Sequence, residues 1–265
     1  MLFAANDDRY LYARAPLVEV ICQLRFPTIL SIGAKEPAEF QEAIRGDYPR
    51  YAVRQEPSPP KLSGLGTPNP TVQQQPPVTN YHFVSQDGMW KINLTNNFIA
   101  LSTIAYTQWE EFAQRLDKIL AHFIRIHQPA FFERVGLRYL NAVSRKALGL
   151  EDMLWDDLIQ SPYIGILSEP DVDENAVVKS ALDVELPLEG GCHLKLHAGP
   201  GMLKRGAQET SPEKRFILDG DFSVVGSLPA DQLPARMEQL HRHAVRLFQG
   251  AITRELHDAM GPMPL

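Results

Sequence analysis

The chain has 265 residues, of which 44% are hydrophobic and 22% charged, as is ordinary for a globular protein. Its net charge of −6 argues against nucleic-acid binding through a strong overall positive field, although a local basic face remains compatible with it. No stretch has the roughly 20 consecutive apolar residues that cross a bilayer. Asp7 and Asp8 stand where a signal peptide would be basic or apolar. We therefore expect a cytoplasmic protein that makes no membrane contact.

The first predicted strand, 15–26, is followed by a short helix. Apolar residues alternate from Val18 to Phe26, which is typical of a strand with one buried face. Pro37 then precedes apolar residues at helical spacing, and Gly46 offers a stop.

The segment from Glu56 to Val78 differs in composition from the rest of the chain. It contains seven prolines and three consecutive glutamines, with few large apolar residues. Such a composition predicts a long exposed loop, and loops of this length in compact domains are usually functional or disordered.

An antiparallel meander and a long helix are predicted next. The meander consists of three short runs rich in aromatic and β-branched residues, at 81–85, 89–95 and 98–104. A helix follows over 107–127, and we expect the Thr107 hydroxyl to cap it, with Glu110 closing a capping box. Its apolar stripe consists of Trp109, Phe112, Leu116, Ile119, Leu120 and Phe123.

The second half of the chain repeats this order of elements. A strand at 131–144 and a helix at 150–160 are predicted to precede further strands and a long amphipathic helix. These later strands are predicted at 177–188, 192–198 and 215–225, and the closing helix at 231–260.

The predicted fold class is therefore α+β, with antiparallel sheets backed by two long helices. The order of strand, helix, meander and helix in each half is that of a pseudo-duplicated, TATA-binding-protein-like saddle, by analogy of element order alone. We expect one unit at 1–128, containing the Pro-rich loop 56–78, and a second at 129–265. One continuous domain is the alternative.

Several segments together resemble a known protein family. They are APLVEVICQLRF, GDYP, ERVGLRYLNAV, FILDGDF and LHRHAVRLFQGAITRELHDAMG. The chain resembles an uncharacterised prokaryotic family of about this length, sporadically distributed among bacteria and archaea. The resemblance implies no established activity, cofactor or catalytic residue. A scattered distribution suggests horizontal transfer, and so a context of defence or mobile elements.

Candidate residues for catalysis are few. Asp219 and Asp221 are expected on one face of a strand about 6–7 Å apart, where two carboxylates can bind a divalent cation or act as acid and base. Glu185 on a neighbouring strand is the third candidate. The alternative, which we favour, is a pair of solvated carboxylates at a β-bulge allowed by Gly220. The histidines and both cysteines lack a metal-ligand spacing, so we predict no metal and no cofactor.

Candidate binding residues lie on the middle strand and in a later loop. Arg134, Arg138 and Asn141 are placed on one outward face, where they can bind a planar or anionic ligand, and Lys204 and Arg205 add a basic loop. The alternative is that both arginines pair with carboxylates across the sheet.

The sequence most favours a non-enzymatic binding or protein-interaction module, with a protein partner or a homodimer. No convergent catalytic set appears in the sequence, which is the main support for this interpretation. Two alternatives remain: a nucleic-acid-binding module that uses a basic sheet face, and a metal-assisted hydrolase centred on Asp219 and Asp221.

Overall fold

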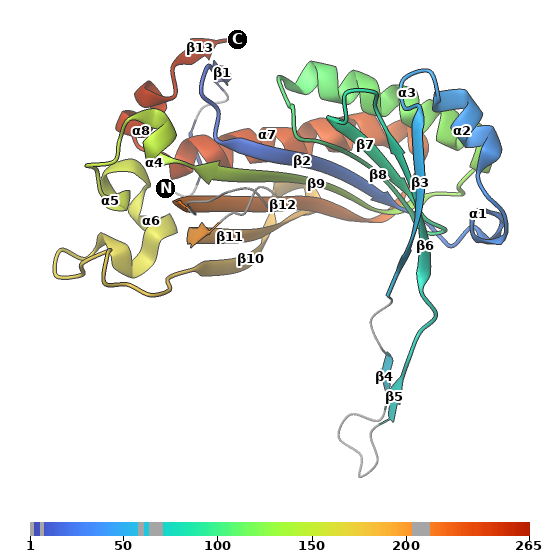
Figure 1. The fold of residues 1–265 in the computed structure, drawn as a ribbon, viewed down its shortest axis with the longest axis horizontal. Helices are drawn as coiled ribbons and strands as arrows, with labels where there is room; N and C mark the ends of the chain where they lie inside the picture. The colour runs from blue at the N-terminus through green and yellow to red at the C-terminus, as the bar shows by residue number, and fades with distance from the viewer. Residues whose placement is uncertain (1–2, 6–7, 58–60, 64–70, 203–212) are drawn as a thin grey trace.

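One antiparallel sheet dominates the structure. The computed structural model describes residues 3–5, 8–57, 61–63, 71–202 and 213–265. Within them, a nine-stranded sheet has the order β10-β11-β12-β9-β2-β8-β7-β6-β3 (Figure 1). Its strands are β2 (Leu17–Arg25), β3 (Arg50–Glu56), β6 (Val78–Val84), β7 (Trp90–Leu94), β8 (Phe98–Thr103), β9 (Phe132–Val143), β10 (Leu182–Leu188), β11 (Cys192–Met202) and β12 (Lys214–Leu228).

The sheet is continuous across the two predicted units. Strands β2 and β9, the first strand of each unit, pair with each other at the centre of the sheet. Each is flanked on its other side by the last strand of the meander that follows it, β8 beside β2 and β12 beside β9. The predicted α+β class, the meander and the strands of the second half are therefore confirmed.

Two long helices, α3 (Trp109–His127) and α7 (Leu233–Ala251), lie on one face of this sheet (Figure 1). Every residue of the predicted stripe on α3 is buried, and Phe123 packs against Phe26 at 4.9 Å between ring centroids. Helix α7 packs over β9 and β12. Each large apolar side chain buried at these contacts contributes about 1.5–3 kcal/mol, so the amphipathic stripes hold the two layers together. Both cysteines are free and buried on strands, as predicted.

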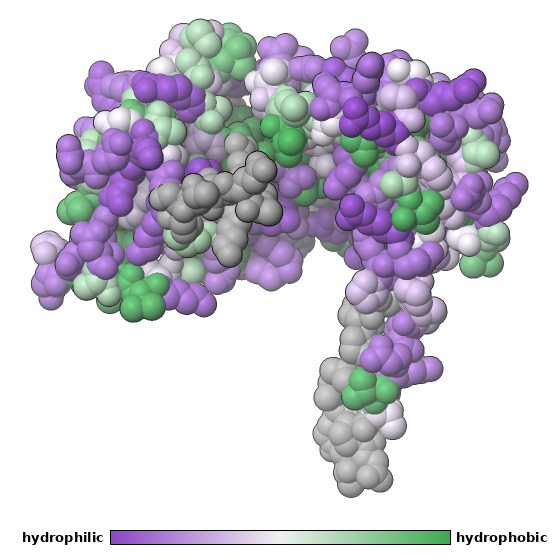
Figure 2. All heavy atoms as spheres, viewed as in Figure 1, coloured by the Kyte–Doolittle hydropathy of each residue, from purple (hydrophilic) through white to green (hydrophobic). Residues whose placement is uncertain are grey.

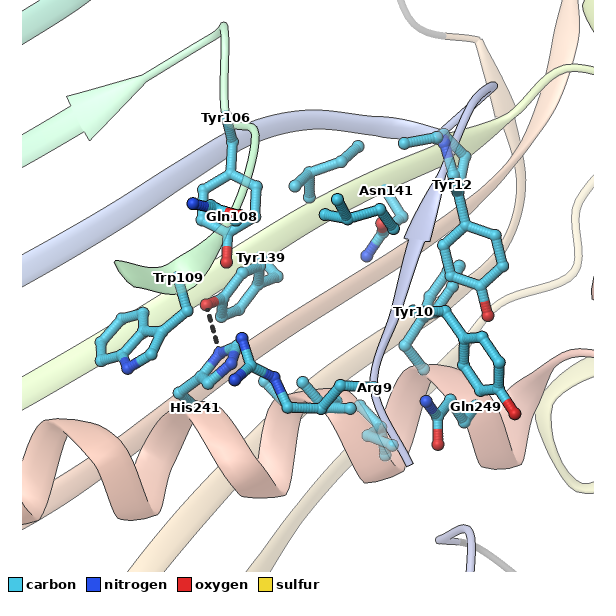
Figure 3. A pocket seen from close by; sticks show the side chains of 18 of the residues that line it. Arg9, Tyr10, Tyr12, Tyr106, Gln108, Trp109, Tyr139, Asn141, His241 and Gln249 are labelled. Atoms are coloured by element: carbon cyan, nitrogen blue, oxygen red, sulfur yellow. Dashed lines mark hydrogen bonds between the residues drawn. The ribbon is translucent and has the colours of Figure 1, made fainter. Parts of the chain in front are cut away.

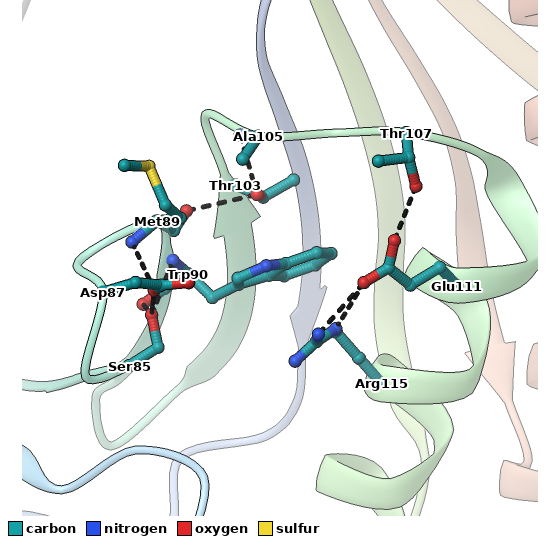
Figure 4. A network of polar contacts seen from close by, with 9 residues as sticks. All are labelled: Ser85, Asp87, Met89, Trp90, Thr103, Ala105, Thr107, Glu111 and Arg115. Atoms are coloured by element: carbon teal, nitrogen blue, oxygen red, sulfur yellow. Dashed lines mark hydrogen bonds and ion pairs between the residues drawn. The ribbon is translucent and has the colours of Figure 1, made fainter. Parts of the chain in front are cut away.

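The start of α3 differs from the predicted capping box. The helix begins at Trp109, and its N-cap residue, Gln108, makes no side-chain cap hydrogen bond. Thr107 instead donates to the Glu111 carboxylate, which also accepts from Arg115 over the Trp90 ring (Figure 4). The predicted box fails because its two partners are engaged elsewhere, Glu110 by an ion pair described below.

The predicted closing helix is two helices. Helix α7 ends at Ala251, and α8 spans Arg254–Ala259. Between them the chain is extended, and Ile252 forms a β-bridge with Ile159. Thr253 then caps α8 by accepting from the Leu256 amide at 3.3 Å. Apolar periodicity continues through this break, which is why the sequence predicted one helix.

The predicted helix at 150–160 is replaced by a series of short helices. They are α4 (Arg145–Leu148), α5 (Trp155–Leu158), α6 (Ser161–Ile164) and the 3₁₀ helix η1 (Gly165–Ser168). Leu154 is extended, and its amide donates to Asp157, so a new helix starts there. A half-buried ion pair between Arg145 and Glu174, at 2.7 Å, fixes the surrounding loops.

The Pro-rich segment 56–78 is not simply a loop. Strand β3, which the sequence did not predict, and β6 form a long antiparallel pair at its base. Further out, β4 (Lys61–Ser63) pairs with β5 (Thr71–Gln73), and this hairpin extends far from the body (Figures 1 and 2). We call it the arm.

The remaining elements are small. Helices α1 (Leu30–Ala34) and α2 (Ala38–Ile44) follow β2, and α2 confirms the predicted short helix. Near the two ends of the chain, β1 (Tyr10–Tyr12) pairs with β13 (Pro262–Pro264) in a separate two-stranded sheet. Across the described ranges, no helix combines the length and the apolar character that a membrane span requires.

A candidate ligand-binding pocket beneath helix α7

A cavity of about 410 Å³ lies between α7 and the sheet. Strands β9 and β12 form its floor, α7 one wall, and β1 and the segment before α3 its other sides (Figure 3). Small-molecule sites usually measure about 300–1,000 Å³, so the cavity is large enough for a ring-containing ligand.

The floor of the cavity depends on a glycine in the middle of a strand. Strand alternation directs Leu218, Gly220 and Phe222 of β12 toward α7. A Cβ on Gly220 would lie 2.9 Å from the Phe222 ring and 3.2 Å from a Leu247 methyl group. The missing side chain therefore lets Phe222 and Leu247 pack closely against the backbone of the floor. The ladder is regular at Gly220, so the predicted bulge there is wrong, and the register shifts only between Val225 and Leu228.

Aromatic rings surround the cavity. Tyr106 and Tyr139 meet edge to face at 5.8 Å between centroids, and Tyr12 on the opposite side packs against Phe248 of α7 at 5.8 Å. The Tyr12 hydroxyl also lies 3.0 Å from Nδ1 of His257, which attaches β1 to α8. These rings give the pocket a largely apolar surface with hydroxyl groups at its margin.

His241 is a buried histidine at one end of the pocket. Its Nδ1 lies 2.8 Å from the Tyr139 hydroxyl, and its ring stacks on Trp109 at 4.5 Å between centroids (Figure 3). Burial lowers the pKa of His241 to about 3, so the imidazole is neutral near pH 7. Its Nε2 has no hydrogen-bond partner among the described residues. His241 is thus an uncharged polar residue in the wall of the pocket, and its Nε2 remains able to form a hydrogen bond with a ligand.

The charge of Arg9 at the pocket is already compensated. Both terminal nitrogens of its guanidinium contact the Glu110 carboxylate, at 2.7 and 3.1 Å. This hydrogen bonding raises the pKa of Arg9 and lowers that of Glu110. Arg9 is the one charged side chain among the described residues that line the cavity, so no unpaired charged side chain there attracts an ionic ligand.

Asn141 supplies a hydrogen-bonding group near the centre. Its side chain is only 7% exposed, and its amide nitrogen donates to the Leu218 carbonyl oxygen over a long 3.4 Å. Figure 3 shows the amide pointing into the space between the Tyr139–His241 pair and β1. An amide in this position can donate to or accept from a ligand.

The structure separates Asn141 from the arginines with which it was grouped. Asn141 faces α7, whereas Arg134 and Arg138 project from the open face of β9, so the prediction of one shared face is wrong. Arg134 binds Asp221 at 2.8 Å and Arg138 binds Asp219 at 2.7 Å. The alternative of cross-strand ion pairs is therefore confirmed. Lys204 and Arg205 lie outside the described residues.

The three carboxylate candidates share the open face but do not converge. Asp219 and Asp221 each bind an arginine of β9, and Glu185 binds Lys195 at 2.7 Å. Lys195 lies between Glu185 and Asp221 in the register of the sheet. No group of three metal-ligating side chains occurs in the described part of the chain. The metal-assisted hydrolase therefore stays a prediction with no further support.

Sequence reasoning missed most of the pocket because its residues come from distant segments. One signal was available: His241 interrupts the apolar stripe of α7, four residues after Met237 and three before Ala244. A polar residue within a buried helix face needs a partner. Tyr139 is that partner, 102 residues away in the sequence.

Comparison with known proteins adds no functional information. No protein-family model matches the chain, and no curated protein shows detectable sequence similarity to it. The resemblance to a sporadically distributed prokaryotic family stays a prediction.

Proposed function

We propose that this protein is a ligand-binding protein whose pocket beneath α7 takes up a small, uncharged, largely apolar molecule. The observation that carries this proposal is the cavity of about 410 Å³, walled by aromatic rings and containing the Asn141 amide. Packed protein interiors hold few voids larger than a water molecule. A cavity of this size with a few convergent polar groups is typical of a binding site.

The polar groups at the pocket define the class of ligand. Arg9 is neutralised by Glu110, and His241 is uncharged near pH 7, so neither favours an anion. Tyr106, Tyr139 and Asn141 can exchange hydrogen bonds with a hydroxyl or carbonyl group. We therefore expect a ring-containing ligand with one such neutral group.

The strand order supports the predicted relation between the two halves. In this proposal the halves are duplicated units joined through β2 and β9, and the pocket lies near their junction, with residues from both. A site at such a junction would belong to neither unit alone. The proposal retains the predicted non-enzymatic binding role and places it in this pocket.

Binding of the neutral naphthalene dye Prodan tests the proposal. Its emission shifts to shorter wavelength in apolar surroundings, so we expect a saturable blue shift with the wild-type protein. Ala244→Leu places a larger side chain in the wall of the pocket on α7, where leucine favours helix. We expect it to weaken binding about tenfold or more, equal to about 1.4 kcal/mol.

The matched control is Ala121→Leu, the same change on the exposed side of α3. It should bind Prodan as the wild type does. Competition then tests the ligand class: 2-naphthol should displace the dye, and naphthalene-2-sulfonate should not. Equal dye binding by folded Ala244→Leu and wild-type protein would show that the dye binds elsewhere, and the proposal would fail.

A further inference from the structure

Strand β3 is an uncovered edge of the main sheet. It ends the strand order, and each of its seven residues, Arg50–Glu56, is exposed. Its outer side therefore presents backbone groups that no described strand uses.

The ladder shows which of these groups point outward. The Ser85 amide donates to the Trp90 carbonyl oxygen at 3.0 Å, so odd-numbered residues of β6 face β7. Hydrogen-bonding direction alternates along an antiparallel strand, and the even-numbered residues of β6 therefore face β3. These pair with the even-numbered residues of β3. The N–H and C=O groups of Tyr51, Val53 and Gln55 are thus free for another strand.

The two edges of the sheet differ in how they are protected. At the opposite edge, β10 carries Pro187 and two acidic residues, Asp183 and Glu185, which disfavour the addition of a strand. Strand β3 has neither a proline nor a bulge. Its charged residues are of both signs, which permits pairing with a complementary strand.

We propose that β3 is a dimer interface, at which it pairs antiparallel with β3 of a second copy of this chain across a two-fold axis through Val53. In this register all seven residues are paired. Arg50 lies opposite Glu56 of the second copy, and Tyr51 lies opposite its Gln55. Opposite charges at directly facing positions stabilise a strand pair, and this contact occurs twice.

Charge selects this register over its neighbours. An axis through Ala52 would place Arg50 opposite Arg54, and an axis through Arg54 would place that residue opposite itself. Like charges at facing positions destabilise a pair. Glu56 accepts from Asn80 at 2.8 Å but its side chain remains 49% exposed, so it can also bind an arginine.

The side chains of β3 also fit this arrangement. Tyr51 and Val53, 39% and 41% exposed, lie on the helix-bearing side with Phe83 and Tyr81. A two-fold axis perpendicular to the sheet keeps the helices of both copies on the same side. Val53 would then face Val53 of the second copy, Tyr51 would lie beside Gln55 of the second copy, and the two sheets would join into one.

Sedimentation equilibrium over a range of protein concentrations tests the interface. We expect the wild-type protein to associate to twice its chain mass of 29.8 kDa. Val53→Pro removes an outward N–H and should give a monomer. Arg50→Glu should also weaken the dimer because it opposes Glu56, and the double variant Arg50→Glu/Glu56→Arg should restore association.

One control keeps this result distinct from the proposal for the pocket. The monomeric variants should still bind Prodan, which shows that they are folded. A wild-type protein that stays monomeric at every concentration would overturn the interface. So would a dimer that persists in Val53→Pro, or a charge exchange that fails to restore association.

Discussion

The two faces of the sheet differ in the charge of their side chains. The face beneath α7 carries apolar and aromatic side chains, with neutral polar groups such as Asn141 and His241 at the pocket. The open face carries ion pairs across β9, β12, β11 and β10, including Arg134–Asp221 and Lys195–Glu185. The charged residues that drew attention in the sequence therefore lie mostly on the open face. The candidate site on the other face consists mostly of uncharged residues.

This division follows from the geometry of strands. Successive side chains of a strand point to opposite faces, and burial of an unpaired charge is costly. The face covered by helices can therefore retain polar groups only when they are neutral or paired. Neutral His241 and the Arg9–Glu110 pair satisfy this condition in different ways.

The largest expected difference between the faces concerns packing. Leu137 and Leu140 lie on the same strand, but Leu137 is fully buried beneath the helices and Leu140 is half-buried on the open face. We expect Leu137→Ala to lower the free energy of unfolding by about 2–5 kcal/mol. Leu140→Ala should cost about 1 kcal/mol, because less apolar area is buried there.

Guanidinium denaturation of both variants measures this difference. The dependence of the free energy of unfolding on denaturant concentration should be the same in both variants, which shows that their folded and unfolded states are comparable. Equal losses of stability would mean that something covers the open face of β9 in solution. The same change on one strand thus distinguishes a bare face from a covered one.

A smaller effect concerns the pH dependence of stability. Burial and the nearby charge of Arg9 hold the pKa of His241 at about 3, while Glu110 acts in the opposite direction. In the unfolded chain a histidine titrates at about 6.5. As the pH falls below that value, the unfolded state takes up a proton that the folded state does not, so the free energy of unfolding decreases.

This loss amounts to about 1.4 kcal/mol per pH unit between the two pKa values. His241→Leu should remove the contribution of this histidine. Denaturation curves at several acidic pH values measure the resulting change in how steeply the free energy of unfolding depends on pH. Part of the slope should persist because burial lowers the pKa of other histidines in the same direction. These are His82, His127 and His243. Parallel pH profiles for the variant and the wild type would contradict the assignment.

Local patterns predicted much of the fold. The alternation in β2, the meander of β6 to β8 and the stripe of α3 are each encoded within a single segment, and the structure confirms them. Strand β3 was missed because both of its faces are exposed, so it has no apolar alternation. The break after α7 was missed because it depends on a contact between Ile252 and Ile159, which are far apart in the chain.

The candidate site was much less predictable. Asn141 was singled out but assigned to the wrong face, because its burial depends on α7 and β12. Gly220 was interpreted as a bulge, whereas its role depends on what its missing side chain would contact. Pocket geometry arises from side chains that meet only after folding, and no spacing within one segment records it.

The smallest expected effects concern the ion pairs of the open face. Arg134 and Asp221 have side chains 21% and 31% exposed, whereas Lys195 and Glu185 are 62% and 70% exposed. Double-mutant cycles with alanine should give a coupling of about 0.5–1 kcal/mol for the first pair and about 0.3 kcal/mol or less for the second. High salt should reduce both couplings, and the second more completely.

Gly136, on the backbone beneath the Arg134–Asp221 pair, allows a sharper test of the coupling between these two residues. The Arg134 guanidinium lies across Gly136, where a Cβ would collide with it. Gly136→Ala should therefore displace the arginine and abolish its coupling to Asp221, although neither charge has changed. If the coupling between Arg134 and Asp221 is the same in the Gly136→Ala background as in the wild type, the ion pair does not require the Arg134 side chain to lie against Gly136. Loss of coupling would show that the open face, like the pocket floor at Gly220, is shaped by a missing side chain.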